Sequence, residues 1–203
     1  MKQLVLATHN RDKTREISAL LFDLGVGVLT LDEFPQIGPI PEDADTLEGN
    51  ALLKANAVSR ATGLPALGDD TGLEVHFLYG DPGVYSSRYS GEHGSYAENV
   101  AKLIAKMKGV PPRRRAARFR CALAFVAPGI GVRMAEGLCR GNILERPRGT
   151  GGFGYDPVFL PAGFDRTLAE MDLSMKNTIS HRGLAMQGML PILREYFQTE
   201  LRT

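Results

Sequence analysis

Nine consecutive residues combine glycines with aromatic rings and a carboxylate: Gly149-Thr150-Gly151-Gly152-Phe153-Gly154-Tyr155-Asp156-Pro157. Four glycines and a proline in this run exclude the interior of a helix or of a central strand. The run therefore predicts a loop whose backbone closely approaches another group. Aromatic rings beside hydrogen-bonding groups suit a planar heterocycle such as a nucleobase. The alternative is a glycine-rich turn in which Phe153 and Tyr155 fill the core.

A second candidate site is the segment Thr8-His9-Asn10-Arg11-Asp12-Lys13, which follows a short apolar run. Asn10 is a good N-cap, so a helix is expected to begin after it. The free backbone N–H groups and the positive dipole end of that helix, together with Lys13, favour phosphate binding. The glycines of a Walker loop are missing. The alternative is ordinary capping by Asn10 with Lys13 in solvent.

The carboxylate pair Asp69-Asp70, between two glycines, is the third candidate, and we expect it in a turn at the end of a strand. Adjacent carboxylates repel each other, so the pair favours a bound cation. Glu42, in an acidic loop, is a further candidate ligand. Carboxylate oxygens without a His or Cys cluster favour magnesium over zinc. A turn without a ligand is the alternative.

Three cations, Lys176, His181 and Arg182, gather where a last helix is expected to begin near Ser180. The helix dipole disfavours positive charge there, which an anion or an acceptor-rich ligand would explain. The alternative is a surface helix that Ser180 caps. A separate arginine cluster over residues 113–120 has few interleaved aromatic residues and favours a solvated loop that leads into a strand.

Hydrophobic periodicity predicts the elements that position these groups. Alternating or apolar runs indicate strands over residues 4–7, 26–31, 73–77, 119–125 and 132–138. Capping residues place helices after Asn10, Asp45 and Ser95, and Pro191 is expected to bend the last helix or to end it early. Strands and helices mixed in this way predict an α/β fold with an antiparallel portion.

Composition excludes several function classes. The 203 residues can form one sizeable core, and 43% hydrophobic with 23% charged residues are typical of soluble globular proteins. A net charge of +1 gives no field that favours nucleic acid or a membrane. Neither a signal peptide nor a membrane span is expected. Cys121 and Cys139 form no disulfide framework or metal pair, so we expect a cytoplasmic protein.

The motifs, in this order, resemble those of the inosine/xanthosine triphosphate pyrophosphatases, the house-cleaning nucleotidases for noncanonical purines. Six motifs carry the resemblance along nearly the whole chain: Thr8-x-Asn10-x-x-Lys13, Thr46 to Ala51 with Lys54, Asp69 to Leu73, Pro82 to Tyr89, Gly149 to Pro157, and Ser180 to Gly183. Departures are small: Leu47 stands where Phe is usual, Thr71 stands where Ser is common, and His9 fills a variable position.

The resemblance implies an elongated, mixed-sheet α/β fold of two lobes with a central nucleotide-binding cleft, formed by a single domain over residues 1–203. It also implies a homodimer that hydrolyses noncanonical purine triphosphates to the monophosphate and pyrophosphate with Mg²⁺. Asp70 is then the proton acceptor, and Glu42 and Asp70 are the metal ligands. The implied substrate-binding residues are Thr8, His9, Asn10, Arg11, Asp12, Lys13, Lys54, Thr71, Phe153, Gly154, Tyr155, Asp156, Lys176, His181 and Arg182.

Within that set the resemblance implies a division of roles. Lys13 and Lys54 belong to the residues that hold phosphates, Phe153 stacks on the base, and the cations near Ser180 read its edge together with Asp156. Inosine and xanthosine present an oxygen at purine position 6, whereas adenine presents an amino donor. Cationic donors satisfy the oxygen and leave the amino group unpaired, which discriminates between the two.

Three rival functions stay open on the residues alone. They are a Maf-like nucleotide pyrophosphatase of related fold, a sensor that binds nucleotide without hydrolysis, and a nucleic-acid-binding module. The Phe153–Asp156 and Ser180–Arg182 motifs disfavour the first. The carboxylate of Asp70 disfavours the second, and the near-neutral net charge disfavours the third.

Overall fold

The computed structural model describes residues 2–199, and the chain divides into two compact units. Unit 1 contains the chain up to Asp70, Cys121–Gly137 and the segment that begins at Arg182. Unit 2 contains Thr71–Arg120 and Leu138–His181. The described part holds no helix that is long and apolar enough to cross a membrane.

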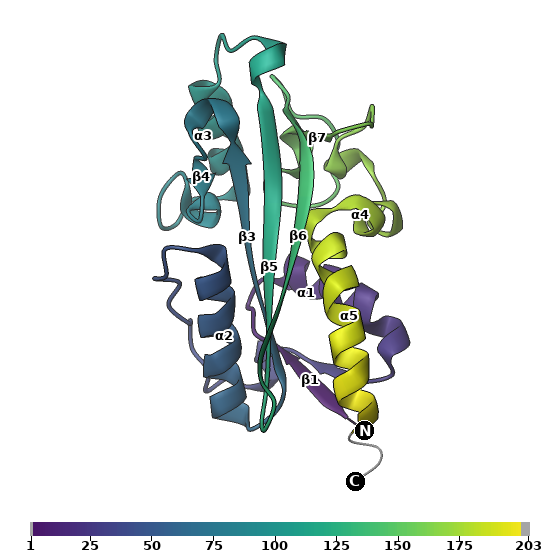
Figure 1. Cartoon of the computed structure of the whole chain (residues 1–203). Coiled ribbons are helices and arrows are strands. Elements are labelled where there is room, and N and C mark those ends of the chain that lie inside the picture. Colours follow the sequence, from purple (N-terminus) through teal and green to yellow (C-terminus); the bar gives the residue numbers. More distant parts are fainter. Residues whose placement is uncertain (1, 200–203) are drawn as a thin grey trace. The chain divides into compact units, whose positions relative to one another are not determined.

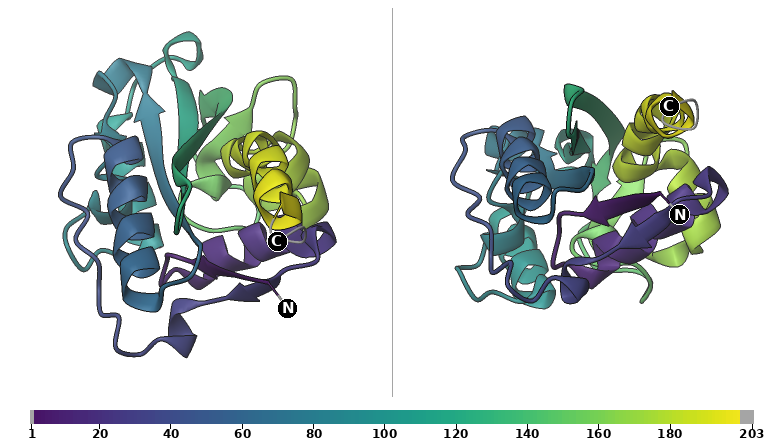
Figure 2. Two further views of the ribbon diagram at one scale, coloured as in Figure 1. Left: turned by 60° about the horizontal axis from the view of Figure 1, so that its bottom comes forward. Right: turned by 90° about the horizontal axis from the view of Figure 1, so that it is seen from below.

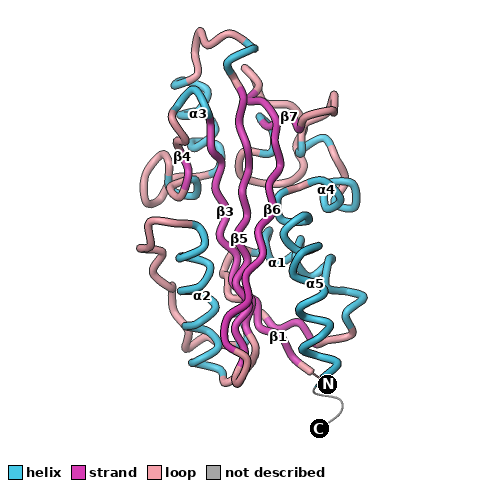
Figure 3. Tube along the Cα trace, in the orientation of Figure 1, coloured by secondary structure: helices cyan, strands magenta, loops and turns pink. Residues whose placement is uncertain are grey.

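Helices and strands are mixed along the chain (Figure 1, Figure 3), which confirms the predicted mixed α/β class. The α-helices are α1 (Arg11–Leu21), α2 (Leu47–Thr62), α3 (Tyr96–Lys106), α4 (Leu173–Ile179) and α5 (His181–Thr199). The strands are β1 (Gln3–Leu6), β2 (Gly27–Leu29), β3 (Ala66–Val75), β4 (Pro82–Gly83), β5 (Ala116–Ala127), β6 (Gly131–Ile143) and β7 (Phe159–Pro161). The strand order is β2-β1-β3-β5-β6-β7, and β4 pairs with β3.

Unit 1 is built on β1, which pairs in parallel with both β2 and β3. Successive side chains of β1 point to opposite faces, as in any strand. Leu4 and Leu6 join a core cluster with residues of α1 and α5, whereas Val5 joins a second cluster with Val58 of α2. Accordingly, α2 and α5 lie on opposite sides of these strands (Figure 2).

Local capping sets where the helices of unit 1 begin. The Asn10 side chain caps α1, as predicted, by accepting from the backbone N–H groups of Asp12 and Lys13. The cap of α2 is Thr46, which accepts from Gly49 N, so the prediction of Asp45 as this cap is wrong by one residue. Gly68 then lets α2 pack tightly on β3, because a Cβ there would lie 2.1 Å from a backbone oxygen of α2.

Unit 2 has its own core, to which α3 contributes Val100 and Leu103, and β6 pairs antiparallel with β7. Ser95 caps α3, as predicted, and forms a reciprocal capping box with Glu98. The prediction that the arginine cluster over residues 113–120 is solvated is wrong for Arg115, which is buried. Its guanidinium donates to the backbone oxygens of Met107, Val110 and Ile143, among others, so it closes the core rather than facing solvent.

Two further expectations differ from the structure. Helix α5 contains Pro191 yet continues to Thr199, so the helix does not end early. Met189 and Leu193, on either side of the proline, are fully buried, and this burial offsets the lost backbone hydrogen bond. Sequence reasoning also missed α4, a helix of seven residues that Asp172 caps.

Candidate active site

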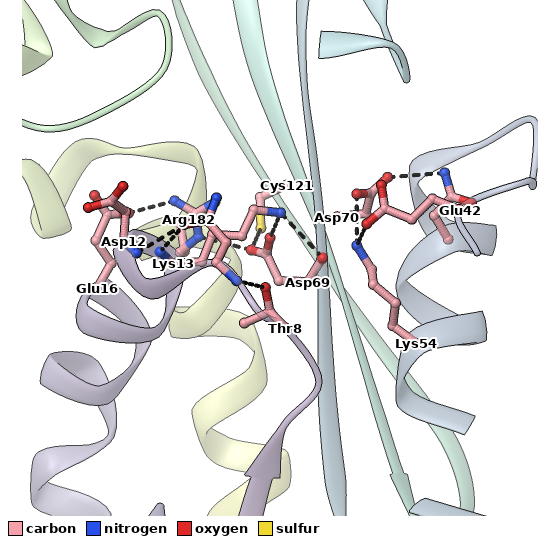
Figure 4. Close-up of polar contacts among 12 residues, drawn as sticks. Thr8, Asp12, Lys13, Glu16, Glu42, Lys54, Asp69, Asp70, Cys121 and Arg182 are labelled. Atoms are coloured by element: carbon pink, nitrogen blue, oxygen red, sulfur yellow. Dashed lines mark hydrogen bonds and ion pairs between the residues drawn. The ribbon is translucent and has the colours of Figure 1, made fainter. Parts of the chain in front are cut away.

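The candidate site is centred on β3, where Asp69 and Asp70 lie in the middle of a ten-residue strand. The prediction of a turn at a strand end is therefore wrong. Because neighbouring side chains of a strand point to opposite faces, the two carboxylates separate (Figure 4), and each contacts its own cations. Their adjacency in sequence thus gives no repulsion that a shared cation must neutralise.

Asp69 belongs to a buried network of alternating charge on one face of β3. Its carboxylate lies 2.5 Å from Lys13 Nζ and accepts from Arg182 Nε at 2.9 Å. Arg182 Nη1 in turn lies 2.5 Å from Glu16 Oε2. The Cys121 thiol donates to Asp69 at 3.2 Å. Of the four charged side chains, only that of Lys13 reaches solvent appreciably, with 14% exposed.

Charge and burial oppose each other in this network. Burial alone would raise the pKa of Asp69, but the charges of Arg182 and Lys13 hold it well below its ordinary value. Burial lowers the pKa of Lys13, and the carboxylates Asp69 and Asp70 more than offset this, so that pKa is raised. Burial and the Asp69 charge raise the pKa of the Cys121 thiol well above its ordinary value. Asp69 and Lys13 are therefore charged at neutral pH, and Cys121 is a neutral thiol.

Asp70 faces α2 on the opposite side of β3 (Figure 4). Its Oδ1 lies 3.0 Å from Lys54 Nζ, which also lies 2.6 Å from Glu42 Oε1. Asn50, one helical turn before Lys54, donates to Asp70 Oδ2 at 3.3 Å. Burial is the largest influence on the pKa of Asp70 and raises it, although Lys54 and Lys13 act in the opposite direction. A carboxylate with a raised pKa among cations has the character of a general base.

The N-terminal loop differs in detail from the expected phosphate cradle. Asn10 itself occupies the backbone N–H groups of Asp12 and Lys13. Thr8 Oγ1 accepts from Asn10 N. His9 Nε2 lies 3.3 Å from the backbone oxygen of Gly38. Arg11 is exposed and pairs with Asp32 at 3.6 Å. The phosphate prediction for this loop thus depends on the Lys13 ammonium more than on free backbone donors.

The glycine-rich loop forms a second polar cluster, which lies in unit 2. Asp156 is buried and accepts both from Phe153 N, at 2.9 Å, and from Lys176 Nζ. Lys176 Nζ also lies 4.9 Å from the centre of the Phe153 ring. Gly152, at φ +65°, allows this closure, because a Cβ there would lie 2.1 Å from Asp156 Oδ2. The loop therefore holds an aromatic ring, a carboxylate and an ammonium together.

The remaining predicted base-binding residues lie in different surroundings. Tyr155 packs in the core of unit 2 and donates to Ser86 O at 2.9 Å. This agrees with the alternative interpretation of the glycine-rich loop, in which this ring fills the core. His181 is buried and stacks on Phe119, with ring centres 4.5 Å apart. Arg182 belongs to unit 1 and is engaged by Glu16 and Asp69. The role of Arg182 in reading the base stays a prediction.

The predicted residues therefore fall into two groups. Unit 1 holds Thr8, His9, Asn10, Arg11, Asp12, Lys13, Glu42, Lys54, Asp70 and Arg182, and unit 2 holds Thr71, Phe153, Gly154, Tyr155, Asp156, Lys176 and His181. Sequence reasoning missed Glu16 and Asn50. The signal for both is helical spacing, since Glu16 is three residues after Lys13 and Asn50 is four residues before Lys54.

The donor set of the site fits a magnesium ion. Across residues 2–199, His, Cys, Asp and Glu side chains form no group of three or more that could hold a metal. Glu42 and Asp70 nevertheless share the ammonium of Lys54 as a common cationic neighbour. Magnesium in nucleotide enzymes is usually held by one or two carboxylates together with substrate phosphates, which is the arrangement this pair offers.

The Asp69 network gives the first testable prediction, the pH dependence of stability. A carboxylate whose pKa is lowered by folding stabilises the fold above its unfolded pKa, about 3.9, and that contribution is lost as the pH falls through the folded pKa. Asp69→Asn is expected to lower the free energy of unfolding by roughly 1–3 kcal/mol at pH 7. In urea titrations, the difference from wild type should shrink below about pH 4. A difference that is constant from pH 7 to pH 3 would contradict the low pKa of Asp69.

Comparisons with known proteins give one consistent result. The sequence matches the Ham1 family over residues 4–192, which covers both units. It is 49% identical over 186 residues to a dITP/XTP pyrophosphatase of Geobacter sulfurreducens, covering 92% of this chain and 94% of that protein. A solved HAM1 protein from Coxiella burnetii has a TM-score of 0.86 at 38% identity, over 96% of this chain and all of the other. A solved dITP/XTP pyrophosphatase from Mycobacterium abscessus has a TM-score of 0.74 at 40% identity, over 94% of this chain and 99% of the other.

Proposed function

This chain belongs to the Ham1 family, and on that premise we propose that it hydrolyses noncanonical purine nucleoside triphosphates to the monophosphate and pyrophosphate. Its relatives are named dITP/XTP pyrophosphatases, so the proposed substrates are inosine, deoxyinosine and xanthosine triphosphates. The observation in the structure that best supports a hydrolase is the contact of buried Asp70 with Lys54, which Glu42 also contacts.

The residues of unit 1 suit the phosphate chemistry. A triphosphate repels a water nucleophile, and the ammonium groups of Lys13 and Lys54 reduce that repulsion. Asp70, with its raised pKa, takes the proton of the attacking water. Lys54 and Asn50 orient the two carboxylate oxygens of Asp70. Glu42 and Asp70 are the proposed ligands of Mg²⁺, which when bound stabilises the charge that develops on the leaving pyrophosphate.

The cluster in unit 2 suits recognition of the base. Phe153 offers a ring for stacking, and Lys176 offers a donor to the oxygen at purine position 6. Asp156 holds the Lys176 ammonium and the Phe153 backbone at once, so it fixes their spacing. An adenine amino group at position 6 would face the Lys176 cation, and Asp156 Oδ2 beside it already accepts from Lys176 and from Phe153 N, which disfavours adenosine triphosphate.

We propose in addition that the protein is a cytoplasmic homodimer that does not act on nucleic acid. Both cysteines are free and buried, which suits a reducing compartment. The near-neutral net charge supports a free nucleotide as the substrate rather than a polymer. The dimer follows from the family resemblance. Equilibrium sedimentation of the purified chain tests it, and a monomer at micromolar concentration would contradict it.

Product analysis tests the proposed reaction. Incubation with inosine triphosphate (ITP) and Mg²⁺ is expected to give inosine monophosphate and pyrophosphate in equal amounts, as resolved by phosphorus NMR. Inosine diphosphate with orthophosphate would show a different bond cleaved. Tight binding of ITP without any product would instead favour a nucleotide sensor.

Removal of the metal is a separate prediction. Excess EDTA is expected to abolish turnover and added Mg²⁺ to restore it, because carboxylate oxygens are the ligands that the site offers. Pyrophosphate release is measured before and after the addition. Full activity in EDTA would contradict the metal proposal, and recovery with Zn²⁺ but not with Mg²⁺ would contradict the choice of ion.

A further inference from the structure

Tyr96 contacts the ring that we assign to base stacking, although neither the motifs nor the chemistry above give this tyrosine a role. The ring centres of Tyr96 and Phe153 lie 5.8 Å apart at an interplanar angle of 44°. Tyr96 is 41% exposed, so its ring is not required to fill the core. Resting on the proposed function, we propose that Tyr96 is a positioning residue that holds Phe153 ready to stack on the purine.

The backbone of Tyr96 is firmly placed. It is the first residue of α3 and lies within the capping box that Ser95 forms with Glu98. One turn further along the helix, buried Asn99 accepts from Ser90 N at 2.7 Å and donates to Ser87 O at 3.0 Å. These contacts hold the start of α3, and with it the backbone that carries the Tyr96 ring.

The Phe153 ring, by contrast, lies on a loop in which a glycine precedes it and another follows it. Gly152 and Gly154 flank it, both at positive φ, and Asp156, Lys176 and Tyr96 contact its backbone or ring. Ordering a mobile side chain on binding costs free energy, and holding it in advance removes that cost. Of these three contacting residues, Asp156 belongs to the glycine-rich loop and Lys176 pairs with Asp156. Tyr96 lies on α3 and contacts the Phe153 ring from there. Its ring therefore preorganises the stacking surface.

The effect belongs to binding rather than to chemistry. An aromatic pair contributes about 0.5–1.5 kcal/mol, so Tyr96→Ala is expected to raise KM for ITP roughly 2- to 12-fold. The value of kcat should stay within about twofold of wild type, because the groups around Asp70 are unchanged. Tyr96→Phe keeps the ring and should restore the wild-type KM. Tyr79→Ala, which removes a fully exposed tyrosine of the same unit, is the matched control and should change neither constant.

Two further measurements separate positioning from a general structural role. In a Phe153→Ala background, Tyr96→Ala should add almost nothing, because the ring on which it acts is gone. Amide hydrogen exchange at Phe153, whose N–H donates to Asp156, should accelerate in Tyr96→Ala and not in Tyr79→Ala.

The outcomes distinguish this inference from the function on which it rests. If wild type hydrolyses ITP and Tyr96→Ala has an unchanged KM, or if Tyr96→Phe fails to restore it, the positioning role is wrong. If wild type does not hydrolyse ITP, the proposed function is wrong. Exchange at Phe153 then still decides whether Tyr96 holds the loop, since an unchanged rate would overturn that claim without any substrate.

Discussion

Asp70→Asn is expected to reduce kcat for ITP by about 10²–10⁴-fold, the usual effect of removing a general base. The amide has nearly the same shape as the carboxylate but accepts no proton from the attacking water. The raised pKa of Asp70 has a second consequence in wild type. Activity should fall as the pH drops through that pKa, which lies above the ordinary pKa of an aspartate. Pyrophosphate release is measured for wild type and for Asp70→Asn from about pH 4 to about pH 9, and the two profiles give the loss of turnover and its pH dependence.

Stability provides the control for Asp70→Asn. Folding raises the pKa of Asp70, so the buried charge opposes folding at neutral pH, and a neutral side chain there should not lower the free energy of unfolding. Asp81→Asn, which changes an exposed carboxylate, should keep full turnover. Near-normal pyrophosphate release by Asp70→Asn would remove Asp70 from the chemistry.

Arg182→Met is expected to lower the free energy of unfolding by about 3–5 kcal/mol, the usual effect of removing one partner from a buried ion pair. Methionine keeps most of the volume but leaves the carboxylates of Glu16 and Asp69 without their shared cation. Urea titration at pH 7 measures the loss. Arg113→Met, which removes an exposed arginine, is the control and should change stability little.

This prediction also tests the role that the motifs assign to Arg182. A residue whose main task is to donate to the base edge would change the preference for ITP over adenosine triphosphate and leave stability intact. Unchanged unfolding in Arg182→Met, together with a smaller preference, would therefore contradict the structural role and favour base recognition.

The elements that local chemistry determines could be predicted from the sequence. Asn10 caps α1, and Ser95 caps α3 in a capping box with Glu98, because each cap depends on residues within one helical turn. The mixed α/β class follows from the alternation of short apolar strands with amphipathic helices. Lys54 contacts both Asp70 and Glu42, so the structure brings together three residues that the motifs select.

Features that depend on tertiary partners could not be predicted. Asp69 and Asp70 look like a turn because aspartate and glycine are common in turns, yet cations on both faces of β3 stabilise them within a strand. Arg115 looks solvated because two of its carbonyl partners, Ile143 and Leu144, are distant in sequence. Pro191 is tolerated because burial around it outweighs one missing hydrogen bond.

Substrate choice is the central claim, and catalytic efficiency tests it most directly. We would measure kcat/KM of the wild-type protein for ITP and for adenosine triphosphate at one Mg²⁺ concentration and one pH. A site that pairs a cation with the oxygen at purine position 6 predicts a preference for ITP of about 10²-fold or more. Equal efficiencies for the two nucleotides would contradict the account, because Lys176 and its neighbours would then not read the base.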